Sequence, residues 1–289
     1  MNRREMLALS IAGGAAMASF PRPASARSRR SGADDSPEHQ AAVAGGVAYF
    51  SDRCDTQAGL CRKLEAAIAS GDLAAAQQAY IEARPPYEEI ETLAYAFEEV
   101  DADIDARPYA FDAGETDPEF RGFHKIEVLL FGRDDLASAA PYAARLSKSV
   151  QQLKAQLGER DRFDAAGQFG GMYALTNEVA AKKISSEEEA WSDQTLLIFK
   201  HNWIGALSQY EPFDKMVARS DPNASRAVRE AYAGAMETLK PHFRPGVVAA
   251  TPYTKVSVAD RRRMADASNR LRDAVAGASV VIGVDAGIS

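Results

Sequence analysis

The chain has 289 residues, a formal net charge of -7 at pH 7 and 46% hydrophobic residues. Its acidity makes nucleic acid a poor partner, because the phosphate backbone is itself negative. Its length suits one large domain or two small ones, and no segment approaches the ~20 consecutive apolar residues of a membrane helix.

The N-terminal end has the pattern of a signal peptide. Paired arginines at positions 3 and 4 precede an apolar run of about 14 residues, and Ala24-Ser25-Ala26 supplies an A-x-A cleavage site. The arginine pair favours the Tat export route. We therefore expect residues 1–26 to be removed and the mature protein to reside in the periplasm. Residues 27–40 follow as an expected disordered leader.

Apolar residues recur at helical spacing along most of the remaining chain, and strand-like alternation is confined to a weak apolar tail near Val280. One helix is expected to stop at Ser70-Gly71, and Asp72 caps the next, which Pro85-Pro86 interrupts or kinks. The loop-rich residues 158–167 predict a hinge between an N-terminal and a C-terminal bundle. Further helices are expected at residues 119–131, 141–157, 168–183, 187–217, 223–240 and 256–276.

A run of eight acids without a base lies between residues 88 and 105. Apolar residues at helical spacing are interleaved with the acids, so the run is predicted to pack against the protein. Packed carboxylates need a cation nearby, and the run itself supplies none. We expect two or three of the acids to converge on a cation from elsewhere. The eight are Glu88, Glu89, Glu91, Glu98, Glu99, Asp101, Asp103 and Asp105.

A second signal lies in residues 122–132, where His124 and Glu127 stand three apart among apolar residues. In a helix these two side chains face the same way. A hydrogen bond between them is the simplest explanation of an isolated H-x-x-E pattern. The acidic run just upstream favours instead a metal ion that the imidazole and the carboxylates bind together.

Three other features have structural explanations. The segment Ser186-Glu187-Glu188-Glu189 predicts a capping box with its acids in the first turn of a helix. His201 is expected to be a hydrogen-bonded histidine between helices. Cys54 and Cys61 would lie about 10 Å apart on a straight helix, beyond disulfide reach, so a bridge would require the helix to break at Gly59.

Six short motifs follow one another along the chain. They are Tyr87-Glu88-Glu89-Ile90-Glu91, Asp101-x-x-x-Asp105-x-Arg107, Gly122-Phe123-His124-Lys125-Ile126-Glu127, Asn177-Glu178-Val179, Ser192-Asp193 and Asn202-x-x-Gly205-Ala206. The ordered set resembles the imelysin-like family and is most similar to its periplasmic iron-uptake components of EfeO/EfeM type. The resemblance implies an all-α fold of two helical bundles, which we place at residues 41–160 and 161–289, with a metal site around H-x-x-E.

The resemblance and the acidic run together predict a periplasmic protein that captures iron for an inner-membrane iron permease. The metal is expected to be a divalent or trivalent ion, iron first, with copper or zinc as alternatives. An exported haem-dependent peroxidase is a further partner that the resemblance implies, and the short leader is typical of the form without a cupredoxin-like domain. The expected metal ligands are His124, Glu127, Glu88, Glu91, Asp105 and Glu178, the last at a further glutamate position of the family pattern.

A metal-dependent peptidase is the main alternative, because the family takes its name from a proposed peptidase. A zincin needs H-E-x-x-H, but residues 125 and 128 are Lys and Val, which also excludes H-x-x-E-H. With one histidine and a surplus of carboxylates, the site is expected to bind a metal ion without catalysing a reaction. A third possibility is a protein that binds acidic polysaccharide through a bridging metal ion.

Overall fold

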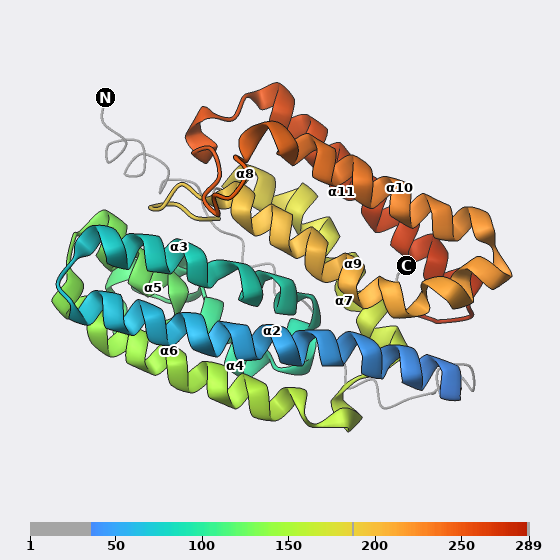
Figure 1. Ribbon diagram of the computed structural model, residues 1–289, viewed down its shortest axis with the longest axis horizontal. Coiled ribbons are helices and arrows are strands. Elements are labelled where there is room, and N and C mark those ends of the chain that lie inside the picture. The colour runs from blue at the N-terminus through green and yellow to red at the C-terminus, as the bar shows by residue number, and fades with distance from the viewer. Residues whose placement is uncertain (1–35, 187, 288–289) are drawn as a thin grey trace. The chain divides into compact units, whose positions relative to one another are not determined.

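The computed structural model describes residues 36–186 and 188–287 (Figure 1), which all belong to one compact unit. The predicted signal peptide, residues 1–26, lies outside this part of the chain, so its export route stays a prediction. The described residues form the all-α fold that the sequence predicts. Their only strand-like pairing is an isolated bridge between Phe243 and Ala250.

The first group of helices is built around α2 (Pro37–Ala69), which packs against both α3 and α6. In Figure 1 these three helices lie side by side, and α4 and α5 lie behind them. The other elements of this group are α3 (Leu73–Ile90), the 3-10 helices η1 (Glu91–Ala96), η2 (Pro108–Ala110) and η3 (Gly114–Thr116), α4 (Glu98–Asp105), α5 (Phe123–Glu127), the π-helix η4 (Val128–Gly132) and α6 (Leu136–Leu157).

The second group is built around α9 and α11, each of which packs against both α7 and α10. Helix α9 also packs against α2 and α3, so the two groups share one hydrophobic core. The division of the chain near residues 158–167 stays a prediction. The elements of this group are η5 (Arg160–Arg162), α7 (Ala165–Glu178), the π-helix η6 (Val179–Lys183), α8 (Ile184–Ser186), α9 (Thr195–Ser220), α10 (Pro222–Leu239), η7 (Lys240–His242), η8 (Tyr253–Lys255) and α11 (Val258–Val281).

Side-chain caps explain where the long helices begin. Asp72 caps α3 as predicted, since its carboxylate accepts a hydrogen bond from the Ala75 amide at 3.0 Å. Ser36 caps α2, whose first residue is Pro37. Residues 37–40 therefore form a helical turn, although we expected them to end a disordered leader. Further side-chain caps are Asp135, Asp164, Asp221 and Ser257.

The helix expected at residues 187–217 begins only at Thr195, and the capping-box prediction is wrong. Residues 188–194 form a loop instead. Glu188 and Glu189 are buried in this loop, where arginines from the first helix group hold their carboxylates. Glu187 is not among the described residues. A long-range ion pair has thus outweighed the local preference for a helix start.

The prolines of α3 do not end it, because the helix continues through Pro85-Pro86 to Ile90. Helix α2 likewise continues through Gly59, so Cys54 and Cys61 remain on one helix, buried and unbridged. Among the described helices, none combines the length and apolar character needed to cross a membrane.

Candidate metal centre

The candidate centre lies where α3, α4, α5 and the loop before α9 meet. Gly122 makes this meeting possible, because it precedes α5 with φ 81° and a β-carbon there would lie 2.3 Å from the carbonyl oxygen of Ile104. Only glycine allows so close an approach without strain. The contact holds the start of α5 against the end of α4, so that His124 Nε2 lies 3.5 Å from Asp105 Oδ1.

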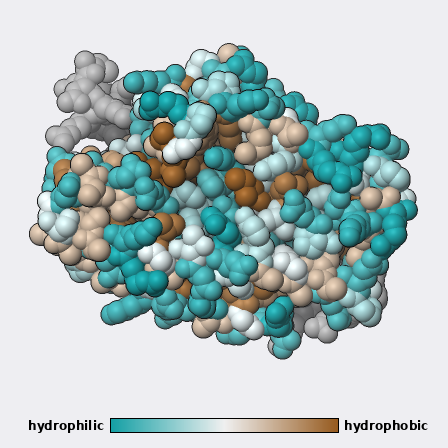
Figure 2. All heavy atoms as spheres, in the orientation of Figure 1, coloured by the Kyte–Doolittle hydropathy of each residue, from teal (hydrophilic) through white to brown (hydrophobic). Residues whose placement is uncertain are grey.

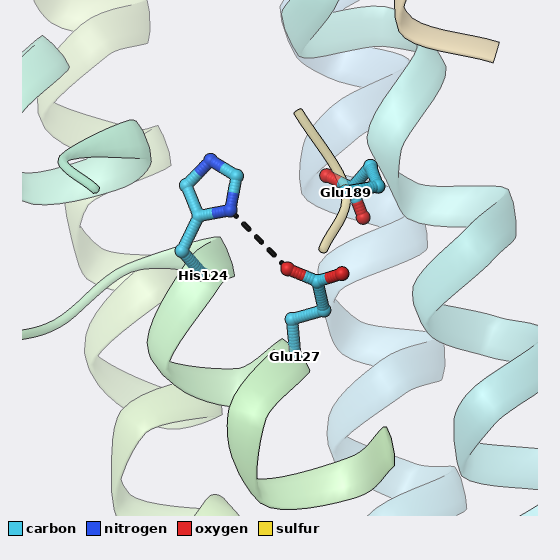
Figure 3. A group of neighbouring side chains, drawn as sticks. All are labelled: His124, Glu127 and Glu189. Carbon is cyan, nitrogen blue, oxygen red and sulfur yellow. Dashed lines mark hydrogen bonds and ion pairs between the residues drawn. The ribbon is translucent and has the colours of Figure 1, made fainter. Parts of the chain in front are cut away.

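His124, Glu127 and Glu189 form the group best suited to hold a metal ion. Each is buried and offers one ligand atom, and these three atoms lie within 4.8 Å of one another. His124 Nδ1 is 3.3 Å from Glu127 Oε2, as the sequence spacing predicts. Figure 3 shows the imidazole and the two carboxylates converging, with Glu189 entering from a different segment. One imidazole and two carboxylates are a donor set that iron and zinc accept.

Hydrogen bonds from the loop before α9 orient both carboxylates. The amides of Trp191 and Ser192 donate to Glu127 Oε1 at 3.0 and 2.8 Å. The Ser192 hydroxyl donates to Glu189 Oε2 at 2.8 Å, and the Tyr80 hydroxyl donates to the same oxygen at 3.0 Å. Partners of this kind fix ligand orientation in protein metal sites. The orientation of both carboxylates is therefore fixed by groups of the protein itself.

Arg84 supplies part of the positive charge that the acidic run requires. Its guanidinium is 1% exposed, lies 2.7 Å from Asp105 Oδ1 and 2.8 Å from Glu189 Oε1, and also pairs with Glu88. It lies over the Phe123 ring as well, 4.6 Å from the ring centroid. Arg84 therefore neutralises acids that come from three different segments.

Glu88 and Glu91 lie in an adjoining part of the same network. The Asn202 amide donates to Glu88 Oε2 at 3.0 Å and to Glu91 Oε2 at 2.9 Å. Lys183, itself fully buried, donates to both oxygens of Glu91 at 3.0 and 2.9 Å. Gly205 permits this arrangement, because a β-carbon at that position would lie 2.3 Å from the Glu89 carbonyl oxygen of α3.

The structure brings together five of the six predicted ligands and leaves one apart. His124, Glu127, Asp105, Glu88 and Glu91 are joined by the contacts described above. Glu178, the last residue of α7, is not part of these contacts. Its side chain is 36% exposed, and its Oε1 lies 4.0 Å from Lys182 Nζ.

Burial and charge shift the protonation of the centre. Burial raises the pKa of Glu88 to about 8 and that of Glu189 to about 7, each value kept down by Arg84. Burial opposes the charged form of His124, but the Asp105 carboxylate outweighs it and raises the histidine pKa to about 9. Burial also opposes ionisation of Asp105, yet Arg84 and Arg107 hold its pKa well below the usual range. A metal ion must therefore displace protons from this centre.

The charges and the hydrogen-bond inventory fit a bound cation. His124 Nε2 is buried and forms no hydrogen bond among the described residues beyond its 3.5 Å ion-pair contact with Asp105 Oδ1. Arg107 pairs with Asp105 and Glu188, and Tyr87 donates to Asp101. Seven carboxyl groups thus surround the fixed cations Arg84, Arg107 and Lys183, and the raised pKa values of Glu88 and Glu189 mean that protons, which a metal ion would replace, balance part of their charge. The carboxyl groups are Glu88, Glu91, Asp101, Asp105, Glu127, Glu188 and Glu189.

Sequence reasoning missed Glu189 and Arg84. The acids before Trp191 looked like a helix start, and the Ser192-Asp193 motif beside them was the only sign that this segment matters. Arg84 stands four residues before Glu88, a spacing at which helical side chains meet, and that signal was available. The prediction for His201 is confirmed, because its Nδ1 lies 2.7 Å from Glu89 Oε1 on a neighbouring helix.

The sequence model of the imelysin family, peptidase family M75, matches residues 37–276. The chain is 28% identical over 225 residues to the iron uptake system component EfeM of Pseudomonas syringae pv. syringae (strain B728a), covering 78% of each chain. It is 31% identical over 219 residues to the iron uptake system component EfeO of Escherichia coli (strain K12), covering 76% of this chain. EfeO of Yersinia pseudotuberculosis serotype I (strain IP32953) is also 31% identical. The match spans only 58% of either EfeO protein.

Proposed function

Because this chain belongs to the imelysin family, we propose that it captures an iron ion with His124, Glu127 and Glu189. The observation that carries the proposal is the buried convergence of these three donors within 4.8 Å of one another. The relatives that align with about three quarters of the chain are named iron uptake system components, which supports iron as the cargo. An imidazole among carboxylates favours iron, copper or zinc over calcium and magnesium, which prefer oxygen ligands alone.

Glu88, Glu91 and Asp105 are proposed to supply the negative charge around the ion. In the structure their carboxylates are held by Arg84, Arg107, Lys183 and Asn202. These three carboxylates can become metal ligands only if their contacts with the cations and with the Asn202 amide break. Glu178 lies outside this arrangement, with its side chain 36% exposed.

Capture fits the site better than peptide hydrolysis does. The side chains of His124, Glu127 and Glu189 are each no more than 1% exposed. A peptidase must admit a polypeptide to its metal ion, and it keeps a coordination position open for water and substrate. A sealed centre with a single histidine instead suits an ion that enters, binds and is later released.

The setting of this activity is also a proposal. We place the protein in the periplasm, where it would pass iron to an inner-membrane iron permease and work alongside an exported haem-dependent peroxidase. The names of EfeM and EfeO describe components of an uptake system, which supports the existence of partner proteins.

Calorimetry with Fe²⁺ on the demetallated mature protein, under anaerobic conditions, tests the proposed ligands. His124→Ala and Glu189→Gln should each weaken binding by roughly tenfold to a hundredfold or more, taking the loss of outer-sphere partners as the lower bound. His201→Ala is the matched control, because it removes a partly buried histidine that pairs with Glu89 outside the three-donor group. Glu178→Gln should also leave the affinity unchanged if Glu178 is not a ligand.

Three outcomes would contradict the proposal. Unchanged iron affinity in His124→Ala would exclude this centre as the binding site. Proteolysis that chelators stop and that His124→Ala abolishes would favour the peptidase alternative. Metal-dependent binding of polygalacturonate, tested on the same proteins, would favour the polysaccharide alternative.

A further inference from the structure

A pocket of about 910 Å³ opens between α2, α3, α9, the end of α10 and the turn that follows η7. Its volume is in the range of small-molecule sites. Pro85, Pro86 and His201 line it, whereas their chain neighbours Arg84 and Asn202 contact the acids of the metal centre. The pocket and the metal centre therefore use different faces of the same two helices.

The walls of this pocket are mostly apolar. The turn at its edge is held by the pairing of Phe243 with Ala250, and Gly246 makes the bend with φ 73°. This turn leaves Val247 43% exposed and Val248 38% exposed beside the opening. In the view of Figure 2 hydrophobic residues reach the surface near the middle of this face, surrounded by polar ones. Other apolar wall residues are Leu60, Leu197, Met236 and Leu239.

Two cations at the pocket have no carboxylate partner among the described residues. Arg53 pairs with Glu89, and Lys240 pairs with Glu237 at 3.2 Å. No such ion pair holds Lys200 or Arg244. Lys200 Nζ instead lies 4.6 Å from the centroid of the Phe243 ring, and Arg244 is the next residue along the chain. Both cations line the pocket, in a protein whose net charge is -7.

We propose that this pocket binds an amphipathic carboxylate, with its apolar chain against the walls and its head group between Lys200 and Arg244. The lining contains four fixed cations, Arg53, Lys200, Lys240 and Arg244, but only two acids, Glu82 and Glu237. An apolar pocket with a few polar groups at one end orients a ligand in this way. An anionic head group also relieves the unbalanced positive charge, which a cationic or neutral head group does not.

Calorimetry with decanoate on the full mature protein tests this proposal, with decyltrimethylammonium as the probe of opposite charge. Wild type should bind decanoate saturably and should not bind the cation. Lys200→Gln/Arg244→Gln should weaken decanoate binding by about tenfold or more, the scale of one or two charge-assisted contacts. Val248→Glu, at an exposed wall position, should abolish binding, because it adds a charge to the apolar wall.

The matched control is Lys255→Gln/Arg262→Gln, which removes the same two charges at exposed positions outside the pocket. It should retain wild-type affinity for decanoate, and all variants should keep the wild-type unfolding temperature. The proposal is overturned if wild type gives no saturable decanoate binding, if both probes bind equally, or if the control loses as much affinity as Lys200→Gln/Arg244→Gln. Equal binding of both probes would indicate a non-selective apolar surface, as a protein-docking site presents.

Discussion

Replacing Arg84 by Met removes the cation that joins three acids at the candidate metal centre. Met keeps the unbranched apolar stem of the side chain, but it removes the positive charge and the guanidinium that lies over the Phe123 ring. Deleting one partner of a buried ion pair typically costs about 3–5 kcal/mol, because the other charge stays buried. Arg84 is 1% exposed and pairs with Glu88, Asp105 and Glu189.

The protonation of these acids decides where in that range the cost falls. Without the guanidinium, Glu88 and Glu189, whose pKa values are already about 8 and 7, can stay protonated near neutral pH. Asp105 keeps Arg107 and His124 as partners. We therefore expect Arg84→Met to lower the free energy of unfolding by about 3 kcal/mol at neutral pH. The cost should shrink as the pH falls toward 5, since the acids then bind protons.

Urea unfolding of the demetallated protein, followed by circular dichroism, measures this cost. Arg53→Met is the matched control, because it removes an arginine that pairs with a single acid and is 26% exposed. Its cost should be about 1 kcal/mol, as for partly exposed pairs. Fe²⁺ at 100 times its Kd stabilises a folded protein by about 2.7 kcal/mol. At equal free Fe²⁺ the metal should stabilise Arg84→Met more than wild type, because its acids lack their internal cation.

Two results would refute this reasoning. The first is a cost for Arg84→Met no greater than that for Arg53→Met. The second is a stabilisation by Fe²⁺ no larger in Arg84→Met than in wild type, which would mean that guanidinium and metal do not compete for the same acids.

Three further predictions follow from the structure and the sequence. Gly122→Ala should cost about 1–3 kcal/mol in urea unfolding, the scale of local backbone strain, because its β-carbon would clash with the end of α4; a cost below that of Gly234→Ala, where the space is open, would contradict it. In the metal-free protein the raised pKa values of Glu88 and Glu189 mean that the folded state binds protons more tightly than the unfolded state does. Their stabilisation is complete below pH about 4.5 and is lost as the pH rises through about 8, so the unfolding temperature should fall across this range; a rising profile would show that other groups dominate. Replacing the arginines at positions 3 and 4 by Lys should leave precursor in the cytoplasm, and undiminished export in cell fractionation would point to the Sec route.

The guanidinium of Arg84 also bears on how an ion could enter and leave. It lies between acids that would otherwise repel one another and pairs with each of them. An arriving metal ion must displace protons and weaken the contacts of Arg84, which lowers its net affinity. Such a cost suits the proposed capture and release of an ion.

The sequence by itself determined what depends on neighbours along the chain. Helical periodicity predicted the all-α fold, Asp72 marked the start of α3, and the spacing of His124 and Glu127 placed both side chains on one helix face. These features are local, because caps and i, i+3 contacts form within one or two turns. The acidic run also predicted correctly that a cation from outside the run would be needed.

Only the tertiary structure decided which cation and which further ligand meet there. Arg84 reaches Asp105 on α4 and Glu189 in a distant loop, and that loop exists because its acids are held by arginines from the first helix group. The local pattern around Glu189 predicts a helix start, yet burying its carboxylate beside Arg84 and Tyr80 outweighs the local preference. Contacts between residues about a hundred positions apart cannot be predicted from the local periodicity of apolar residues, because they depend on how whole helices pack.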